Sequence, residues 1–266
     1  MKTAIGVFDS GVGGLTVLKS LRTEFPKQEF IYLGDTARLP YGAKSGETIR
    51  QYSLQNIRYL ASLNVQAVVV ACNSASTQVT ESELEGLPIY NVIDPGVTAA
   101  LAVTQNNSIG LLGTRATVES HVYQTRLKKQ AALLGKDDLR IFAQACPLFV
   151  PLAEEGWTGD PITNLIVYRY LHPLLHEEVD TMILGCTHYP ILRNSIERAA
   201  GKAVNLVDSG KALANLMKQD FANGRLKPSA SPSLRVLMTD LSSHLQKWAF
   251  EILEETSRPI EVVNTT

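Results

Sequence analysis

The sequence contains two similar segments, and a cysteine stands near the end of each. The first segment covers residues 64–74 and includes Cys72; the second covers residues 178–188 and includes Cys186, 114 residues later. The same spacing relates the short segments 91–94 and 205–208. A repeat of this length exceeds the unit of solenoid proteins and indicates a duplicated α/β domain. If the two halves face each other, the two thiols meet across one cleft.

The composition is that of an ordinary globular protein. The 266 residues suffice for two modest domains, 45% of them are hydrophobic, and the formal net charge is −1. No cluster of Lys and Arg longer than a pair occurs, so nucleic acid is not an expected partner. The apolar run at residues 4–8 is too short for a signal peptide, and no stretch approaches the ~20 apolar residues that span a bilayer. We therefore expect a cytoplasmic protein without a membrane partner, and an odd number of cysteines, three, argues against a disulfide framework.

Apolar segments of strand length alternate with helical patterns along the chain. Strands are predicted at residues 4–8, 30–33, 67–71, 89–93, 109–113, 140–145, 182–185, 203–207, 234–238 and 260–263. Helices are predicted at residues 15–24, 47–63, 211–223 and 242–256, with a further helix starting near Ser74. Continuous rather than alternating Val, Ile and Leu indicate parallel strands that are covered on both faces. We expect an α/β fold with two similar domains, each a mostly parallel sheet flanked by helices, related by a pseudo-twofold axis with the active site between them.

Two turn signals stand at equivalent points of the repeat. They are Asp94-Pro95-Gly96 and Asp208-Ser209-Gly210. We interpret them as the crossings between domains. The first domain is then discontinuous and comprises residues 1–94 plus 210–266, and the second comprises residues 95–209.

Cys72 and Cys186 each follow a buried strand and precede an expected helix start. Ligands gather outside the carboxyl ends of parallel strands, and a helix N-terminus lowers the pKa of a thiol. Ser74 and Thr187 are residue types that cap helices, and the amides beside them can hold a carboxylate. Each Cys could instead be a small buried hydrophobe, but the repetition at matching positions favours a functional pair. Cys146 has no such partner, and core packing is the favoured interpretation there.

Two further residues stand beside these strand ends. Asp9 follows the first strand and precedes the glycine-rich turn 11–14, whose spacing matches no nucleotide-binding motif. A tight turn there would aim Asp9 into the cleft to bind an ammonium group or orient a thiol, although Asp9 could also simply cap a helix. His188 lies two residues after Cys186 and can polarise the thiol or help to protonate a substrate.

The sequence does not favour a metal site. A zinc site at Cys186 and His188 lacks a second pair of ligands at a recognised spacing, and no Glu separates His172 from His176 as a metalloprotease helix requires. The loop at residues 34–42 is rich in polar and turn residues and is expected to carry binding groups. Arg38 of this loop could instead pair with Asp35.

Four motifs, in this order between residues 9 and 190, resemble those of the glutamate racemase family. They are Asp9-Ser10-Gly11-x-Gly13-Gly14, Gly34-Asp35-Thr36-x-Arg38-x-Pro40-Tyr41-Gly42, Ala71-Cys72-Asn73-Ser74-Ala75 and Gly185-Cys186-Thr187-His188-Tyr189-Pro190. Aspartate racemases share the paired cysteines but usually lack the Thr-His-Tyr-Pro sequence. The chain departs from the family at Ser74, where Thr is common; the hydroxyl is kept and a methyl group is lost.

The resemblance implies interconversion of L- and D-glutamate without pyridoxal phosphate, metal or nucleotide, and a supply of D-glutamate for peptidoglycan synthesis. It implies that Cys72 and Cys186 are the acid and base, that Asp9 assists Cys72, and that His188 and Glu154 support Cys186. The residues that it implies for substrate binding are Asp9, Ser10, Pro40, Tyr41, Gly42, Asn73, Ser74, Thr187 and His188. Glutamate is then the small-molecule partner, and the oligomeric state stays open, a homodimer included.

Two other classes of protein compete with this interpretation. A thiol redox or sulfur-transfer enzyme could use both cysteines, but the chain has no Cys-x-x-Cys, and thiols held apart across a cleft would not easily form a disulfide. A two-domain amino-acid binding protein would suit hinge closure. Such a receptor is normally exported, and this chain shows no signal peptide.

Overall fold

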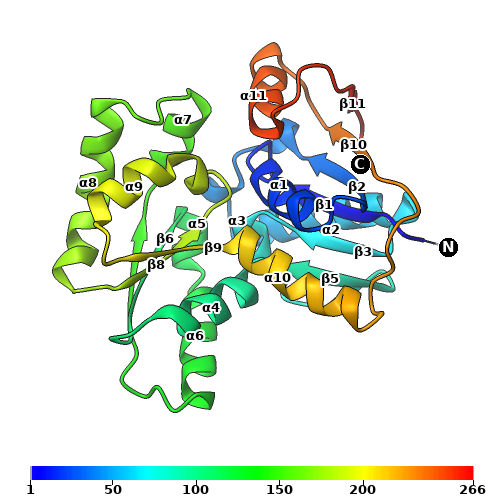
Figure 1. Ribbon diagram of the computed structural model, residues 1–266. Coiled ribbons are helices and arrows are strands. Elements are labelled where there is room, and N and C mark those ends of the chain that lie inside the picture. The colour runs from blue at the N-terminus through cyan, green and yellow to red at the C-terminus, as the bar shows by residue number, and fades with distance from the viewer. Residues whose placement is uncertain (1, 266) are drawn as a thin grey trace.

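The computed structural model describes residues 2–265 and contains two separate sheets (Figure 1). The strands of the first sheet are, in spatial order, β11 (Ile260–Val262), β10 (Ser233–Met238), β2 (Glu29–Gly34), β1 (Ile5–Asp9), β3 (Ala67–Val70), β5 (Leu87–Asn91) and β4 (Glu83–Leu84). The strands of the second sheet are β7 (Arg140–Ala145), β6 (Ser108–Gly113), β8 (Thr181–Gly185) and β9 (Asn205–Asp208). All neighbouring strands pair in parallel except β4 with β5. The predicted α/β class with two mostly parallel sheets is confirmed.

The two sheets share one internal order. The order β2-β1-β3-β5 in the first sheet corresponds to β7-β6-β8-β9 in the second. Strands β3 and β8, which precede the two cysteines, begin at Ala67 and Thr181, and this separation is the spacing of the sequence repeat. The repeat in the sequence is therefore also a repeat of strand topology.

Helices cover the faces of both sheets. They are α1 (Leu15–Glu24), α2 (Gly46–Ser62), α3 (Asn73–Ser76), α4 (Ile93–Val103), α5 (Arg115–Glu119), α6 (Val122–Leu133), α7 (Phe149–Glu154), α8 (Pro161–His176), α9 (Arg193–Ala200), α10 (Ser209–Ala222) and α11 (Ser243–Leu253), with short 3-10 helices at Thr36–Arg38, Tyr41–Ala43 and Tyr189–Leu192. Helix α10 packs against both α1 and α4, which joins the helix layers of the two sheets. None of the helices within residues 2–265 combines the length and apolar character needed to cross a membrane.

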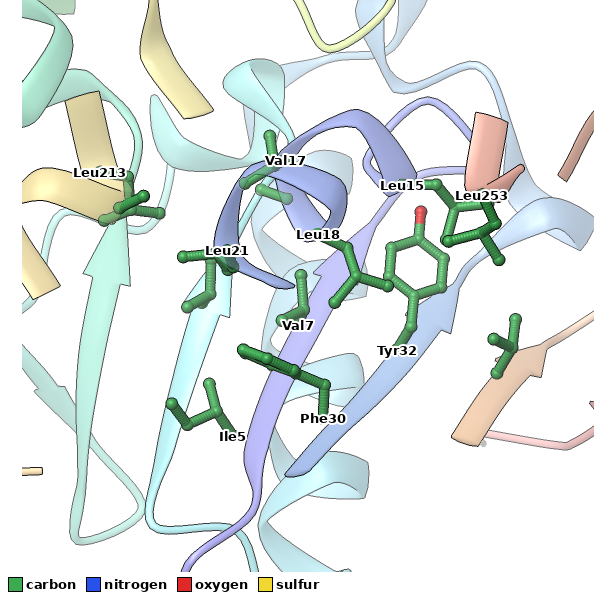
Figure 2. Close-up of a cluster of buried hydrophobic side chains, with 14 of the residues drawn as sticks. Ile5, Val7, Leu15, Val17, Leu18, Leu21, Phe30, Tyr32, Leu213 and Leu253 are labelled. Carbon is green, nitrogen blue, oxygen red and sulfur yellow. The ribbon is translucent and has the colours of Figure 1, made fainter. Parts of the chain in front are cut away.

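Strand β1 is buried on both faces, which accounts for its unbroken apolar sequence. Ile5 and Val7 pack with Leu18 of α1 in one core cluster (Figure 2). Phe8, on the opposite face, belongs to the cluster that α2 covers. At Gly6, a Cβ atom would lie only 3.2 Å from the Leu60 side chain of α2, so the absence of a side chain lets the helix approach the strand. The apolar residues of β1 end at Phe8, and Asp9, the last residue of the strand, leads into the glycine-rich turn.

The two predicted turn signals are helix starts, which corrects the prediction. Residues 94–96 lie in the first turn of α4, and Pro95 is tolerated because the N–H groups of a first turn have no partner within the helix. At the second position, Asp208 caps α10, and its Oδ1 accepts hydrogen bonds from the backbone N–H groups of Gly210 and Lys211. The domain boundaries drawn at these positions stay a prediction.

The helix predicted from Ser74 is a single turn, α3. It is followed by the antiparallel pair β4–β5, of which the sequence pattern predicts only the second strand. The two turn residues of this hairpin, Glu85 and Gly86, have φ values of 51° and 70°. A left-handed pair of this kind is typical of tight hairpins but is usually signalled by Asn-Gly or Asp-Gly rather than Glu-Gly.

We expect Leu18→Ala to lower the free energy of unfolding by about 2–5 kcal/mol, because Leu18 is fully buried between β1 and α1. Leu133→Ala is the matched control: this side chain is 80% exposed, so the same truncation should change stability by less than about 0.5 kcal/mol. Urea denaturation of both variants measures the difference. Equal effects in the two variants would contradict the assignment of this core.

Candidate active site

The ends of β3 and β8 carry Cys72 and Cys186 into one cavity of about 230 Å³. The ends of β1 and β6 lead to Ser10 and Thr114, which line the same cavity. The cavity thus lies where the carboxyl ends of parallel strands from both sheets meet, the usual place for ligands in α/β proteins. A larger groove of about 800 Å³ lies among α1, α10 and α11, but neither thiol lines it. The paired thiols single out the smaller cavity.

Most of the site residues predicted from the sequence are brought together here. Those that line the cavity are Ser10, Pro40, Tyr41, Gly42, Cys72, Asn73, Ser74, Glu154, Cys186, Thr187 and His188. Asp9 is the exception and does not line it. Of the three cysteines, Cys146 also stays outside the cavity and is fully buried in the core of the second sheet, as expected.

Cys72 occupies the N-cap position of α3. Its Sγ accepts a hydrogen bond from the backbone N–H of Ala75 at 3.5 Å and donates to Ser10 Oγ at 3.6 Å. Burial, with a further contribution from the negative charge of Asp9, raises the pKa of the Cys72 thiol to about 12. The expected lowering of this pKa is wrong, because one N–H group of a single helical turn does not outweigh burial. Ser74, expected as the cap, lies within the turn.

Cys186 begins a chain of three side chains. Its Sγ lies 3.8 Å from His188 Nδ1, and His188 Nε2 lies 3.1 Å from Glu154 Oε1. Burial lowers the pKa of His188, but the hydrogen bonds with Cys186 and Glu154 outweigh it and raise this pKa to about 10. The imidazole is therefore protonated at neutral pH. Thr187, expected as a helix cap, is followed instead by a 3-10 helix whose N-cap position is His188.

Asp9 is fully buried behind the cavity wall, which corrects the expectation that the turn aims it into the cleft. Its Oδ2 accepts a hydrogen bond from Gly11 N–H at 3.0 Å, and its Oδ1 accepts one from Thr187 Oγ1 at 3.4 Å. Burial is the main cause that raises the pKa of this carboxyl group. Asp9 thus reaches the cavity through Thr187, a residue of the other half of the repeat.

The glycine-rich turn after Asp9 serves close packing. A Cβ atom on Gly13 would lie 2.4 Å from the His188 ring, and one on Gly14 would lie 2.3 Å from the Cβ of Asp9. Both distances are far shorter than any real Cβ contact, so only glycine fits in this arrangement. The turn is therefore closely packed against both Asp9 and His188.

The loop at residues 34–42 is held by a buried carboxylate. Asp35 accepts a hydrogen bond from Arg38 Nε at 2.8 Å, and the Tyr41 hydroxyl donates to the same carboxylate. Asn56 donates to the Tyr41 hydroxyl at 3.1 Å. The pairing of Arg38 with Asp35, which the sequence left open, is confirmed. The hydroxyl of Tyr41 donates its proton within this loop, to Asp35.

Several residues of the site were not predicted. Ser74 Oγ lies 2.9 Å from Thr114 Oγ1, which lies 3.0 Å from Thr117 Oγ1, so three hydroxyl groups from both halves meet beside the cavity. A signal for Thr114 exists, because segment 109–114 resembles segment 5–10 and places Thr114 opposite Ser10. No comparable signal marks Trp248 of α11, whose ring centroid lies 5.2 Å from that of His188.

The site therefore offers two buried thiols in unlike electrostatic surroundings. A carboxylate lies near Cys72, and a protonated imidazole lies beside Cys186. Residues with hydroxyl groups, among them Ser10, Ser74 and Thr187, complete the lining. Within residues 2–265, no group of three or more His, Cys, Asp and Glu side chains is arranged to hold a metal ion. This arrangement suits the movement of a proton between two sulfur atoms across a small bound molecule.

Comparison with known proteins gives a consistent result. A family model described as Asp/Glu/Hydantoin racemase matches residues 6–217. The glutamate racemase of Aquifex pyrophilus is 46% identical over 244 residues, which is 91% of this chain and 91% of that protein. A crystal structure of a glutamate racemase isoform from Bacillus anthracis has a TM-score of 0.90 at 32% identity and covers 98% of this chain and 97% of its own. The Francisella tularensis glutamate racemase in complex with D-glutamate has a TM-score of 0.89 at 31% identity, with 99% and 98% coverage.

The raised pKa of His188 predicts a pH-dependent contribution to stability. The folded protein holds this proton up to about pH 10, whereas an unfolded histidine releases it near pH 6.5, so the contribution is complete below pH 6.5 and is lost as the pH rises toward 10. The difference in unfolding free energy between wild type and His188→Asn should therefore shrink over this range in urea titrations. A difference for His188→Asn that stays constant would contradict the protonated state.

Proposed function

Because the chain belongs to the Asp/Glu/Hydantoin racemase family, we propose that it interconverts L- and D-glutamate by moving the Cα proton between Cys72 and Cys186. The observation that carries this proposal is one cavity lined by one thiol from each half of the repeat. The choice of glutamate is supported by relatives named glutamate racemase that are 40–46% identical over most of the chain.

In the proposed reaction, the thiolate of one cysteine takes the Cα proton. The C–H bond breaks, an S–H bond forms, and the electron pair is left on Cα and its carboxylate. The thiol of the other cysteine then delivers its proton to the opposite face of Cα, so its S–H bond breaks and a new C–H bond forms. The two sulfur atoms exchange roles, and no further reactant is consumed. The roles of the two cysteines are reversed when the substrate is the other enantiomer.

The difficult step is the removal of a proton that is far less acidic than a thiol. Negative charge on Cα must be stabilised by groups that are already oriented in a site with little water. Cys72 and Cys186 are only 5% and 7% exposed, which supports such a site. The hydroxyl groups of the lining Ser and Thr residues and the Asn73 amide supply the donors. We propose that this stabilisation replaces a pyridoxal phosphate, metal or nucleotide cofactor.

The helpers of the two thiols differ. Asp9 assists Cys72, whose pKa it affects, and His188 with Glu154 assists Cys186 through the hydrogen-bonded chain. The proposed contacts with the substrate carboxylates and amine come from the cavity residues Ser10, Pro40, Tyr41, Gly42, Asn73, Ser74, Thr187 and His188. Asp9 is proposed to act on the substrate through Thr187, since it does not line the cavity. The D-glutamate product is proposed to serve peptidoglycan synthesis in the cytoplasm, on the resemblance to the family alone.

The proposed reaction predicts exchange with solvent. Pure protein incubated with L-glutamate in D₂O, with a chelator and without added cofactor, should bring the optical rotation to zero while the Cα proton is replaced by deuterium. Polarimetry and NMR measure both changes, and L-aspartate is the control substrate, expected to react more slowly. Activity that appears only after pyridoxal phosphate or a metal is added would overturn the mechanism, and an absence of both changes would overturn the function.

We expect Cys72→Ser and Cys186→Ser each to abolish racemisation, because every turnover needs one base and one acid. Cys146→Ser is the matched control: the Cys146 thiol donates to the Gln144 carbonyl at 3.5 Å, and a serine hydroxyl can do the same, so turnover should be nearly intact. Initial rates in both directions measure the effects. Either cavity variant keeping more than about a tenth of the wild-type rate, a loss below ~1.4 kcal/mol, would rule out the two-thiol assignment.

A further inference from the structure

The carboxamide of Asn73 is held from outside the cavity. Asn73 lines the cavity beside Cys72, and its Oδ1 accepts a hydrogen bond from the Tyr123 hydroxyl at 2.7 Å. Tyr123 stands on α6, is fully buried and does not itself line the cavity. Among the described residues, no hydrogen-bond acceptor is assigned to Asn73 Nδ2, so the N–H₂ end of this amide is available to a ligand.

We propose that Tyr123 is a positioning residue for the reaction: by occupying the oxygen of the Asn73 amide, it turns the N–H₂ group toward a carboxylate of the substrate. A carboxylate only accepts hydrogen bonds, and an amide turned by 180° would present an oxygen and repel it. The identification of that carboxylate with glutamate rests on the proposed function.

The direction of the hydrogen bond follows from the surroundings of the hydroxyl. Burial raises the pKa of Tyr123, so the phenol keeps its proton and can donate it. Two oxygen atoms compete for that proton: Asn73 Oδ1 at 2.7 Å and Ser209 Oγ at 3.4 Å. The shorter distance belongs to Asn73, and the Ser209 hydroxyl can donate to the remaining lone pair of the phenol. With this arrangement every hydrogen bond of the network is satisfied while the amide oxygen of Asn73 faces Tyr123.

The same contact connects the two halves of the repeat. Tyr123 packs with Ile93 and Val97 of α4 in a core cluster of the second sheet, whereas Asn73 follows β3 of the first. Ser209 is the first residue of α10, where the chain leaves the second sheet. The Asn73 amide is therefore set correctly only when the two sheets are placed as in this structure. The orientation of the Asn73 amide, which is proposed to bind substrate, therefore depends on the relative position of the two halves.

A double-mutant cycle tests this role. Tyr123→Phe removes only the hydroxyl and should raise KM for glutamate about tenfold, equivalent to ~1.4 kcal/mol, while kcat changes less than about twofold, because binding of a carboxylate is common to ground and transition states. In an Asn73→Ala background, Tyr123→Phe should change KM by less than about twofold, because the amide on which it acts is gone. Equal factors in both backgrounds would overturn the proposal.

Two further variants sharpen the test. Tyr90→Phe is the matched control, since it removes an equally short hydrogen bond, to Asp220 at 2.7 Å, away from the cavity; its KM should be unchanged. Asn73→Asp keeps an acceptor for Tyr123 but presents an oxygen to the cavity, and it keeps the test valid if Tyr123→Phe does not fold. We expect its KM to rise at least about a hundredfold, and a KM near the wild-type value would overturn the proposal. Failure of the wild type to racemise glutamate would refute the proposed function instead. If the wild type racemises glutamate but Tyr123→Phe changes KM by the same factor in both backgrounds, only the role of Tyr123 is refuted.

Discussion

Burial of parallel strands on both faces is the constraint on which the site depends. Strands β1, β3, β6 and β8 are fully buried along their length, and their central residues are apolar or glycine, so polar side chains in these strands stand only at the strand ends. Polar residues appear immediately afterwards, at Ser10, Cys72, Thr114 and Thr187. Because the order of strands is the same in both sheets, each sheet delivers a thiol and a hydroxyl at equivalent points. The geometry of the cavity is thus a consequence of core packing.

The same repeated scaffold carries different charges on its two sides. The position that corresponds to His188 in the first half is Ser74, and the resemblance of segment 109–114 to segment 5–10 places Gly113 opposite Asp9. Cys72 therefore faces a buried carboxyl group and Cys186 faces an imidazolium, although both follow the same kind of strand. A reaction between mirror-image molecules of equal energy does not require symmetric helpers. It requires only that kcat/KM be the same in the two directions. The individual values of kcat and KM can still differ between the directions.

Local sequence patterns predicted every strand of the two sheets except β4, and also the two thiols, because strand periodicity and the repeat act over short segments. The corrections arise where tertiary contacts decide. The pKa of Cys72 depends on burial and on Asp9, which is 63 positions away in the chain, and not only on the helix that follows. The start of α4 at Ile93 resembles a turn because Pro95 and Gly96 suit both. Tyr123 and Trp248 could not be predicted because their roles also depend on tertiary contacts. Each contacts a site residue from a helix that is distant in sequence and carries no motif.

The contacts between the halves explain why a site of this kind cannot be assembled from one domain alone. Thr16 Oγ1 of α1 donates to the Thr187 carbonyl at 2.8 Å, and Thr187 in turn donates to Asp9. Gly13, in the turn after Asp9, packs directly against His188, which follows Cys186. A small opening between the halves would therefore move Asp9 away from Cys186. On the first-cysteine side, Ser74 and Asn73 are held by Thr114 and Tyr123 of the second half. Each thiol is therefore surrounded by groups that the opposite half holds in place, and the chemistry proposed for the pair depends on both halves being in contact.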